Sequence, residues 1–226
     1  MWQQVVQRCC LHGCRNNVKK NYSRLALCRL CGLRQIQIME TLHILQICAF
    51  IVGAIVLTLI SWRALSHTKT HGFYRLLAWQ GILALLVLNT PVWFDNRYAL
   101  HQFFSWWALF SSLLVLFAGI HQLRSAGQAD RAVRADSELF AFEQTTKVVD
   151  TGIYRWIRHP LYCSLLLLAW GIALKQLMPL TVLIALFSSV CLYFTARQDE
   201  RECIAYFGSS YSDYMLRSRM FIPYVF

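Results

Sequence analysis

The sequence predicts an all-α integral membrane bundle of about five transmembrane helices, followed by a C-terminal helical tail in the cytosol. Hydrophobic residues make up 57% of the 226-residue chain and charged residues only 15%, and the mean hydropathy is +0.42. Globular domains average about 45–50% apolar residues. The charges are clustered, which leaves long uncharged runs between them. Buried helices of a soluble protein are the alternative, but several such runs in one small chain favour a membrane protein.

Four apolar runs define the predicted spans. A hydrocarbon core of about 30 Å needs about 20 helical residues to cross it. The runs cover residues 42–60, 76–94, 103–120 and 161–196. The last run is interrupted by Lys175, with Pro179 close behind it. Because each arm must satisfy its own backbone hydrogen bonds in lipid, we expect a tight hairpin of two short spans that turns near these residues.

The distribution of Lys and Arg predicts which loops face the cytosol. In a five-span bundle, residues 61–75, 121–160 and 197–226 lie on one side and carry thirteen of the 22 cations. The opposite side carries only Arg97 and Lys175 if residues 1–38 are left out. Cytosolic loops are enriched in Lys and Arg, so the first group of loops is predicted to be cytosolic. Residues 1–38 oppose this orientation, since they add seven cations and no acid.

Two hypotheses account for this basic N-terminal segment. Met39 could be the start of the native protein, or residues 1–38 could be a targeting segment that is removed, because such segments are Arg-rich and poor in acids. The chain therefore divides into three parts. They are residues 1–38, residues 39–144 with three spans and a cytosolic linker, and residues 145–226 with the hairpin and tail.

The chain has nine cysteines, and five of them precede residue 32. A zinc site is one interpretation of this segment, with Cys9, Cys10, His12, Cys14, Cys28 and Cys31 as the candidate ligands. The Cys28–Cys31 spacing suits a metal knuckle, but the first half matches no familiar finger. We therefore predict no metal site. A disulfide framework is also disfavoured, since the total is odd and the loops face the cytosol.

The stretch GIYRWIRHPLY concentrates polar residues at the mouth of the hairpin. Arg155, Arg158 and His159 directly precede Pro160, which fits the first turn of the next helix. The free N–H groups and positive dipole end of a helix favour an anionic group. The cations could therefore form an anion site that faces the cytosol. They could also simply extend toward lipid headgroups.

The tail places acidic and aromatic residues on the same side of the membrane. Asp199, Glu200 and Glu202 follow the last span, in a helix predicted to end at Phe207 with Gly208 as its cap. A second short helix is predicted over residues 210–220. Acids opposite the basic entrance suit a zwitterionic or cationic ligand, although a solvated helix face is the alternative. Tyr206, Phe207, Tyr211, Tyr214 and Phe221 could form an interfacial belt or wall an adenine pocket.

These motifs resemble the isoprenylcysteine carboxyl methyltransferase and phospholipid methyltransferase superfamily. The similar elements are R-H-P-L-Y, an apolar hairpin, the pair D-E, the run F-G-S-S-Y-S-D-Y-M-L-R and a terminal I-P. They cover about residues 145–226, and their order and spacing follow the family pattern throughout. R-H-P alone would be weak, whereas the whole series is specific.

The resemblance implies an S-adenosylmethionine site that contains Arg158, His159, Tyr162 and Glu200. It also implies that Arg217 handles a substrate carboxylate. Two positions depart from the family pattern. Ser164 stands where the family has glycine, and Asp199 replaces the first of two glutamates.

The predicted function is therefore S-adenosylmethionine-dependent methyl transfer at the cytosolic face of a membrane, with membrane lipid as a partner and no role for nucleic acid. The acceptor predicted first is the carboxylate of an isoprenylcysteine-like substrate. A phospholipid amine and a small thiol are alternatives. Two other classes stay open: an NADPH-dependent membrane reductase of related architecture, and a non-catalytic membrane scaffold with a degenerate motif. The sequence assigns no oligomeric state.

Overall fold

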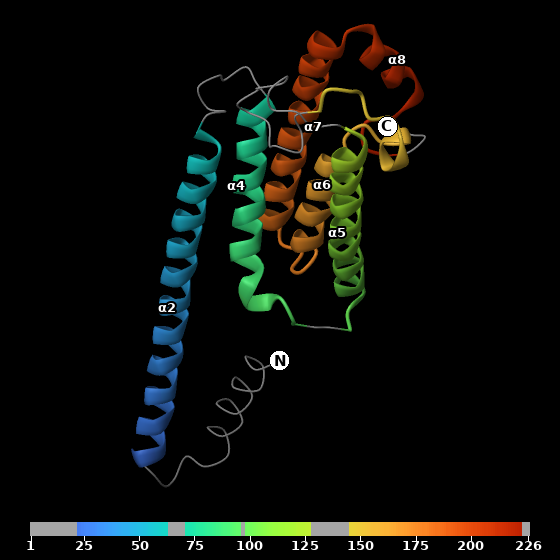
Figure 1. The fold of residues 1–226 in the computed structure, drawn as a ribbon. Coiled ribbons are helices and arrows are strands. Elements are labelled where there is room, and N and C mark those ends of the chain that lie inside the picture. Colours follow the sequence, from blue (N-terminus) through green and yellow to red (C-terminus); the bar gives the residue numbers. More distant parts are fainter. Residues whose placement is uncertain (1–21, 63–70, 96–97, 128–144, 223–226) are drawn as a thin grey trace.

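The computed structural model describes residues 22–62, 71–95, 98–127 and 145–222, and it shows an all-α bundle, as predicted (Figure 1). Two short 3₁₀ segments accompany the helices. The elements in chain order are α2 (Tyr22–Ile60), α4 (His71–Asn89), η1 (Thr90–Val92), α5 (Leu100–Ala126), η2 (Gly152–Arg155), α6 (Pro160–Ala173), α7 (Pro179–Phe207) and α8 (Ser209–Arg217).

Four of these helices contain stretches long and apolar enough to cross a membrane. The stretches are Ile36–Ile60, Gly72–Val92, Leu100–Ala126 and Pro179–Phe207. The remaining apolar helix, α6, has 14 residues. At a rise of 1.5 Å per residue it is about 21 Å long, less than the hydrocarbon core. The described part of the chain therefore has four long helices and one short one. The prediction of two short hairpin arms holds for α6 only, because α7 has 29 residues and runs on into the segment predicted as a tail helix.

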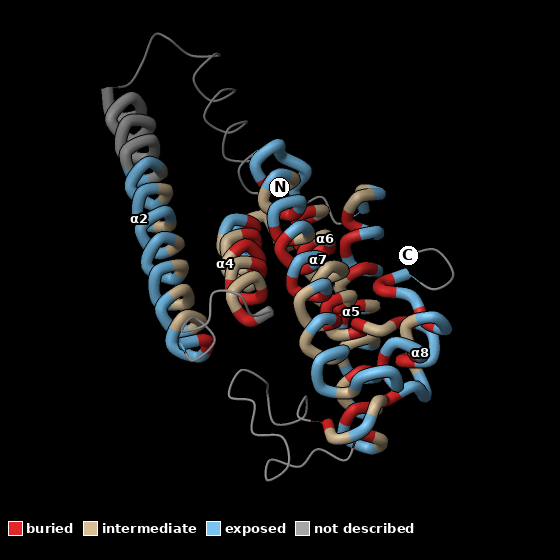
Figure 2. Tube along the Cα trace, turned by 90° about the horizontal axis from the view of Figure 1, so that it is seen from above, coloured by how far each residue is buried: buried red, intermediate tan, exposed pale blue. Residues whose placement is uncertain are grey.

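Small residues let the helices of the core approach closely. Helix α4 packs along α7, and α5 packs along α6. At Gly81 of α4 a side chain would collide with Ser188 of α7, and at Gly171 of α6 a Cβ would lie 3.2 Å from the backbone nitrogen of Leu109. Close backbone approach of this kind is a main source of helix association in membranes. Figure 2 shows α2 to one side of the bundle, and among the described helices α4 is the one it packs beside.

Serine hydroxyls add hydrogen bonds between α5 and α6. Ser105 Oγ donates to the Gly171 carbonyl over 2.7 Å, and Ser112 Oγ donates to the Ser164 carbonyl over 2.8 Å. The Ser164 hydroxyl turns back to the Leu161 carbonyl in its own helix, and the residue is 2% exposed. The serine at the family's glycine position is thus accommodated inside the helix pair.

The hairpin turns where the sequence predicts, between the end of α6 at Ala173 and the start of α7 at Pro179. Lys175 lies in this turn and is almost completely buried. Its ammonium sits 3.6 Å from the ring centroid of Trp106, and it donates to Gln102 Oε1 over 3.1 Å. A desolvated cation over an aromatic face gains about 2 kcal/mol. The contact fixes the turn against α5.

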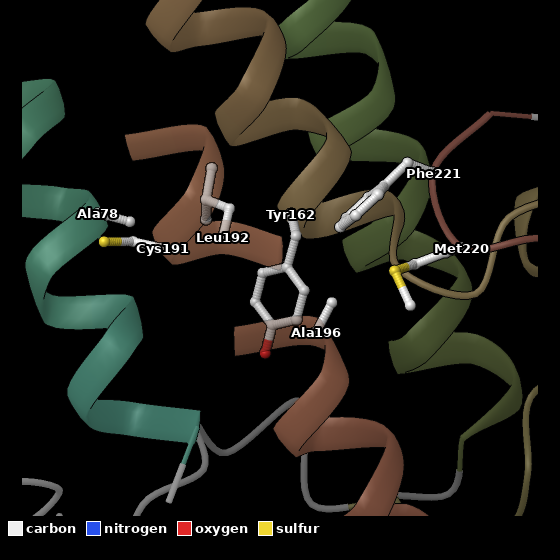
Figure 3. Packing of buried hydrophobic residues seen from close by; sticks show 7 residues of the cluster. All are labelled: Ala78, Tyr162, Cys191, Leu192, Ala196, Met220 and Phe221. Carbon is white, nitrogen blue, oxygen red and sulfur yellow. The ribbon is translucent and has the colours of Figure 1, made fainter. Parts of the chain in front are cut away.

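Beyond the hairpin, α7 continues without a break to Phe207. Gly208 then reverses the chain with a φ of +62°, a conformation that favours glycine, and α8 follows. After Arg217 the chain becomes extended and returns to the start of α6. There Met220 and Phe221 enter a buried cluster with Tyr162, Leu192 and the other side chains of Figure 3. The helix predicted over residues 210–220 is shorter, because residues 218–220 pair with the backbone of residues 156–159.

The N-terminal hypotheses mostly concern residues outside the described ones. The candidate zinc ligands Cys9, Cys10, His12 and Cys14 lie there, whereas Cys28 and Cys31 lie in α2. The zinc alternative and the start at Met39 therefore stay hypotheses. Among the side chains that the structure describes, no three His, Cys, Asp or Glu residues gather as they would around a metal ion.

Candidate functional site

The entrance to α6 and the end of the tail are joined by a short backbone ladder. Ile157 and Arg219 form a parallel β-bridge. The Arg158 amide donates to the Arg219 carbonyl over 2.7 Å, and the His159 amide donates to the Met220 carbonyl over 3.2 Å. The amide of Arg219 donates in turn to the Trp156 carbonyl. Two segments that are 60 residues apart in the sequence therefore meet, as the charge pattern predicts.

A buried ion pair reinforces this junction. Arg158 Nε lies 2.8 Å from Glu200 Oε1, with the two side chains 10% and 3% exposed. Nη1 of the same arginine donates to the carbonyls of Met215 and Ser218 at the end of α8. One guanidinium thus connects the entrance of α6, the C-terminal part of α7 and the tail. The further hydrogen bonds help to offset the desolvation of both charges.

His159 lies between the two acids of α7. Its Nδ1 is 3.5 Å from Asp199 Oδ2, and its Nε2 is 3.5 Å from Glu200 Oε1. The ring stacks on Tyr162 with centroids 5.4 Å apart. Burial by itself lowers the pKa of His159, but the two neighbouring carboxylates outweigh it, and the pKa is raised above its usual value. The site therefore favours the imidazolium form.

A cavity of about 110 Å³ opens beside this cluster. Its wall combines one carboxylate, two basic side chains, aromatic rings and aliphatic groups. The lining residues are Leu123, Thr145, Val148, Val149, Tyr154, Arg158, His159, Pro160, Leu161, Tyr162, Asp199, Cys203, Phe207, Tyr211 and Tyr214. They come from the end of α5, the segment before η2, η2 itself, the start of α6, the end of α7, and α8.

The two adjacent acids take different positions at this cavity. Asp199 lines it and accepts a hydrogen bond from the Tyr162 hydroxyl over 3.2 Å. Its other oxygen lies 3.7 Å from the thiol of Cys203. Glu200 is 2% exposed and lies behind the wall, against Arg158. Asp199 is therefore the carboxylate that a ligand in the cavity would meet.

Two tyrosines close the side of the cavity that α8 forms. The Tyr214 hydroxyl donates to the Tyr154 carbonyl over 2.6 Å, which joins α8 to η2. The Tyr211 ring packs edge to face against Tyr214 and stacks on Phe207. Burial raises the pKa of Tyr211 and of Tyr214 above its usual value, so both hydroxyls stay protonated.

The structure brings four of the five predicted site residues together. Arg158, His159 and Tyr162 line the cavity, and Glu200 supports the first two from behind. Arg217 lies apart from the cavity lining. Its side chain is 68% exposed on α8, with Nη2 3.9 Å from Asp150 Oδ2.

Sequence reasoning named Phe207, Tyr211 and Tyr214 as the wall of an adenine pocket only as one of two alternatives. It placed Asp199 in an acidic site opposite the basic entrance and noted it as a departure from the family, but it did not assign this residue to the cofactor. The sequence did carry a pattern that could have placed Asp199 at the cavity. Asp199 and Cys203 are four residues apart, so they share a face of α7. Leu123 and Val149 carry no such signal. They reach the site through the packing of α5 against η2.

Residues 106–213 match the family model of the phospholipid methyltransferases, which belong to the integral membrane methyltransferase superfamily. No curated protein and no solved structure matches the chain. The family resemblance seen in the sequence is thus confirmed, and the match supports a membrane methyltransferase. The matched stretch begins in α5 and ends before Tyr214, so it includes the entrance and the acid pair but not Arg217.

Replacing Glu200 by glutamine should destabilise the protein by about 3 kcal/mol, because it leaves the buried Arg158 guanidinium without its counter-charge. The measurement is the unfolding midpoint of the protein purified in detergent. Asp213→Asn removes an exposed carboxylate from α8 and serves as the control, with an expected change within about 0.5 kcal/mol. Equal midpoints for the two variants would contradict a structural role for the pair.

The stabilising effect of His159 should depend on pH. Since folding raises the pKa of His159, its contribution is fully present below about pH 6.5, the ordinary histidine value, and is lost as pH rises through the folded-state value. The difference in unfolding midpoint between wild type and His159→Gln should therefore shrink as the pH rises. A difference that grows toward alkaline pH would mean that the neutral imidazole is the stabilising form.

Proposed function

We propose that the chain transfers methyl groups from S-adenosylmethionine to an acceptor carried in the membrane, with the cavity beside His159 as the cofactor site. The observation that carries the proposal is the composition of the cavity wall, which places the Asp199 carboxylate, two basic side chains and a group of aromatic rings at one end of a membrane bundle. The family match over the same segments supports methyl transfer.

The residues of the wall fit the chemical groups of this cofactor. When bound, S-adenosylmethionine supplies an activated methyl group on a positively charged sulfur. Asp199 offers a carboxylate for a cationic group, and the aromatic rings of Phe207 and Tyr211 suit both an adenine and a sulfonium. His159 lines the cavity and is held between Asp199 and Glu200, so its imidazolium form adds positive charge to the wall that an anionic group of the ligand would meet. Glu200, which the family resemblance assigns to the cofactor, would act here by holding Arg158 and His159 in place.

The cavity favours an amine as the acceptor. A protonated amine must lose a proton before its nitrogen lone pair can form a bond to carbon, and the Asp199 carboxylate can accept that proton. Among the described residues that line the cavity, the basic side chains are Arg158 and His159, and both already face carboxylates. An amine headgroup of a phospholipid is therefore the acceptor that we propose.

The carboxylate acceptor predicted from the sequence stays as a second candidate, because Arg217 is exposed on α8. Its guanidinium is paired with Asp150 over 3.9 Å, and it could exchange this exposed partner for a substrate carboxylate in a bidentate arrangement.

We further propose that the cavity faces the cytosol. Arg155, Arg158, Arg197 and Arg217 lie at its end of the bundle, whereas Lys175 lies in the turn at the other end of α6. This asymmetry follows the positive-inside rule. An acceptor lipid would reach the site from the bilayer, since the outer faces of α5 and α7 are apolar and exposed.

Calorimetric titration with S-adenosylmethionine should show binding to wild type and a loss of roughly ten- to a hundredfold in affinity for Asp199→Asn, the effect of removing a charged hydrogen-bond partner. Asp199→Glu keeps the charge and is the matched variant, expected to retain most of the affinity. The absence of binding by well-folded wild-type protein would overturn the proposal. A reductase would then be tested by titrating a nicotinamide dinucleotide.

The nature of the acceptor can be read from the product. Protein in lipid nanodiscs that contain an ethanolamine phospholipid should transfer a labelled methyl group that alkali does not release as methanol, because the N–C bond resists base even where the acyl esters of the lipid are hydrolysed. An S-prenylated cysteine offered as a competing substrate would instead give a methyl ester, which releases labelled methanol in alkali. Release of methanol as the main outcome would favour the carboxylate acceptor over the amine.

A further inference from the structure

The cavity is smaller than the cofactor proposed for it. The described residues enclose about 110 Å³, whereas sites that bury ligands the size of a nucleoside cofactor measure about 300–1,000 Å³. A ligand of this size is fully enclosed here only if part of the wall moves. This step rests on the proposed function.

Helix α8 is a part of the wall with few buried side chains. It has nine residues, and of these only Tyr211 and Tyr214 are buried. Both of these tyrosines line the cavity, while Leu216 and Arg217 face away from it and are exposed. The helix therefore covers the cavity with two side chains and contributes little else to the core.

A glycine with a positive φ angle, Gly208, connects α7 to α8. Gly208 has φ +62° and ψ −136°, and a Cβ at this position would meet no atom within 4 Å. The glycine is thus required by the backbone conformation and not by packing. At the other end, Ser218 is extended, and the strap that follows is held by the ladder to residues 156–159 and by Met220 and Phe221 in the core.

Three side-chain contacts join α8 to the segment in front of α6. They are the hydrogen bond from Tyr214 to the Tyr154 carbonyl, the hydrogen bond from Arg158 to the Met215 carbonyl, and the ion pair of Arg217 with Asp150. The ion pair is long, and its side chains are 68% and 47% exposed, so water and salt screen it. Contacts of this strength can break and re-form readily.

We propose that α8 is a lid over the cofactor cavity, with Gly208 as its hinge and the Arg217–Asp150 pair as its latch. In the open state the latch, the Tyr214–Tyr154 bond and the hydrogen bond from Arg158 to the Met215 carbonyl are broken, while the strap of residues 218–221 stays in place. The lid controls how fast a ligand enters and leaves. Arg217 then acts on ligand exchange through Asp150, without touching the ligand.

The test is the rate of ligand exchange in latch variants. The association and dissociation rate constants of S-adenosylhomocysteine are measured by surface plasmon resonance on protein in nanodiscs. Arg217→Ala and Asp150→Ala should each raise both rate constants by roughly two- to fivefold, the factor that one exposed ion pair supports, with a smaller change in affinity. Exchanging the two charges, with Asp150→Arg and Arg217→Asp in one protein, should return both rates toward wild type.

Arg201→Ala is the control, because it removes an exposed arginine of α7 that contacts Gln198 and not the lid. Its rates should equal those of wild type. Unchanged rates in both latch variants would overturn the lid. Faster dissociation in Arg217→Ala alone, with Asp150→Ala like wild type, would overturn the latch and show that Arg217 holds the ligand itself. Wild-type protein that binds no S-adenosylhomocysteine would instead overturn the proposed function, so the two failures are distinguishable.

Discussion

The buried pair of Arg158 and Glu200 is the constraint on which the rest of the site depends. Both side chains are largely removed from water, so neither charge tolerates the loss of the other. Because the arginine stands before α6 and the glutamate lies in the C-terminal part of α7, the pair fixes how the hairpin is aligned at its open end. The same guanidinium holds two carbonyls at the end of α8, so the tail is positioned by the same charge. The cavity is the space left between these elements.

In this arrangement two neighbouring acids have different roles: Glu200 supports the structure, and Asp199 faces the ligand cavity. Side chains that are adjacent on a helix point about 100° apart, so Asp199 and Glu200 cannot face the same surroundings. Glu200 is paired with Arg158 and His159, whereas Asp199 faces the cavity. An acid pair in such a motif therefore need not bind a ligand through both members. The buried acid keeps the basic groups oriented, and the exposed one meets the ligand.

Much of the fold could be predicted from the sequence, since uncharged runs and the break at Lys175 and Pro179 reflect what a bilayer requires of a helix. That a basic and an acidic segment meet could be predicted too, because they flank one hairpin, whereas Arg158, His159 and Glu200 were singled out by the family resemblance. The direction of the Arg217 side chain could not, since it depends on where α8 turns after Gly208 and on how the strap pairs with residues 156–159. Apolar lining residues such as Val149 have no spacing rule, because their position results from packing.

Helix α6 is held firmly at both of its ends, whereas α8, the proposed lid, is held by few contacts. At about 21 Å, α6 is shorter than the bilayer core, and polar groups hold both of its ends. Lys175 is fixed among Trp106 and Gln102 at one end, and Arg158 is fixed by Glu200 and the strap at the other. These contacts are buried and hold α6 in register with α5 and α7. The contacts of α8 across the cavity are few, and one of them is exposed to solvent. A ligand can therefore displace α8 without disturbing His159 and Asp199, which must stay aligned to bind it.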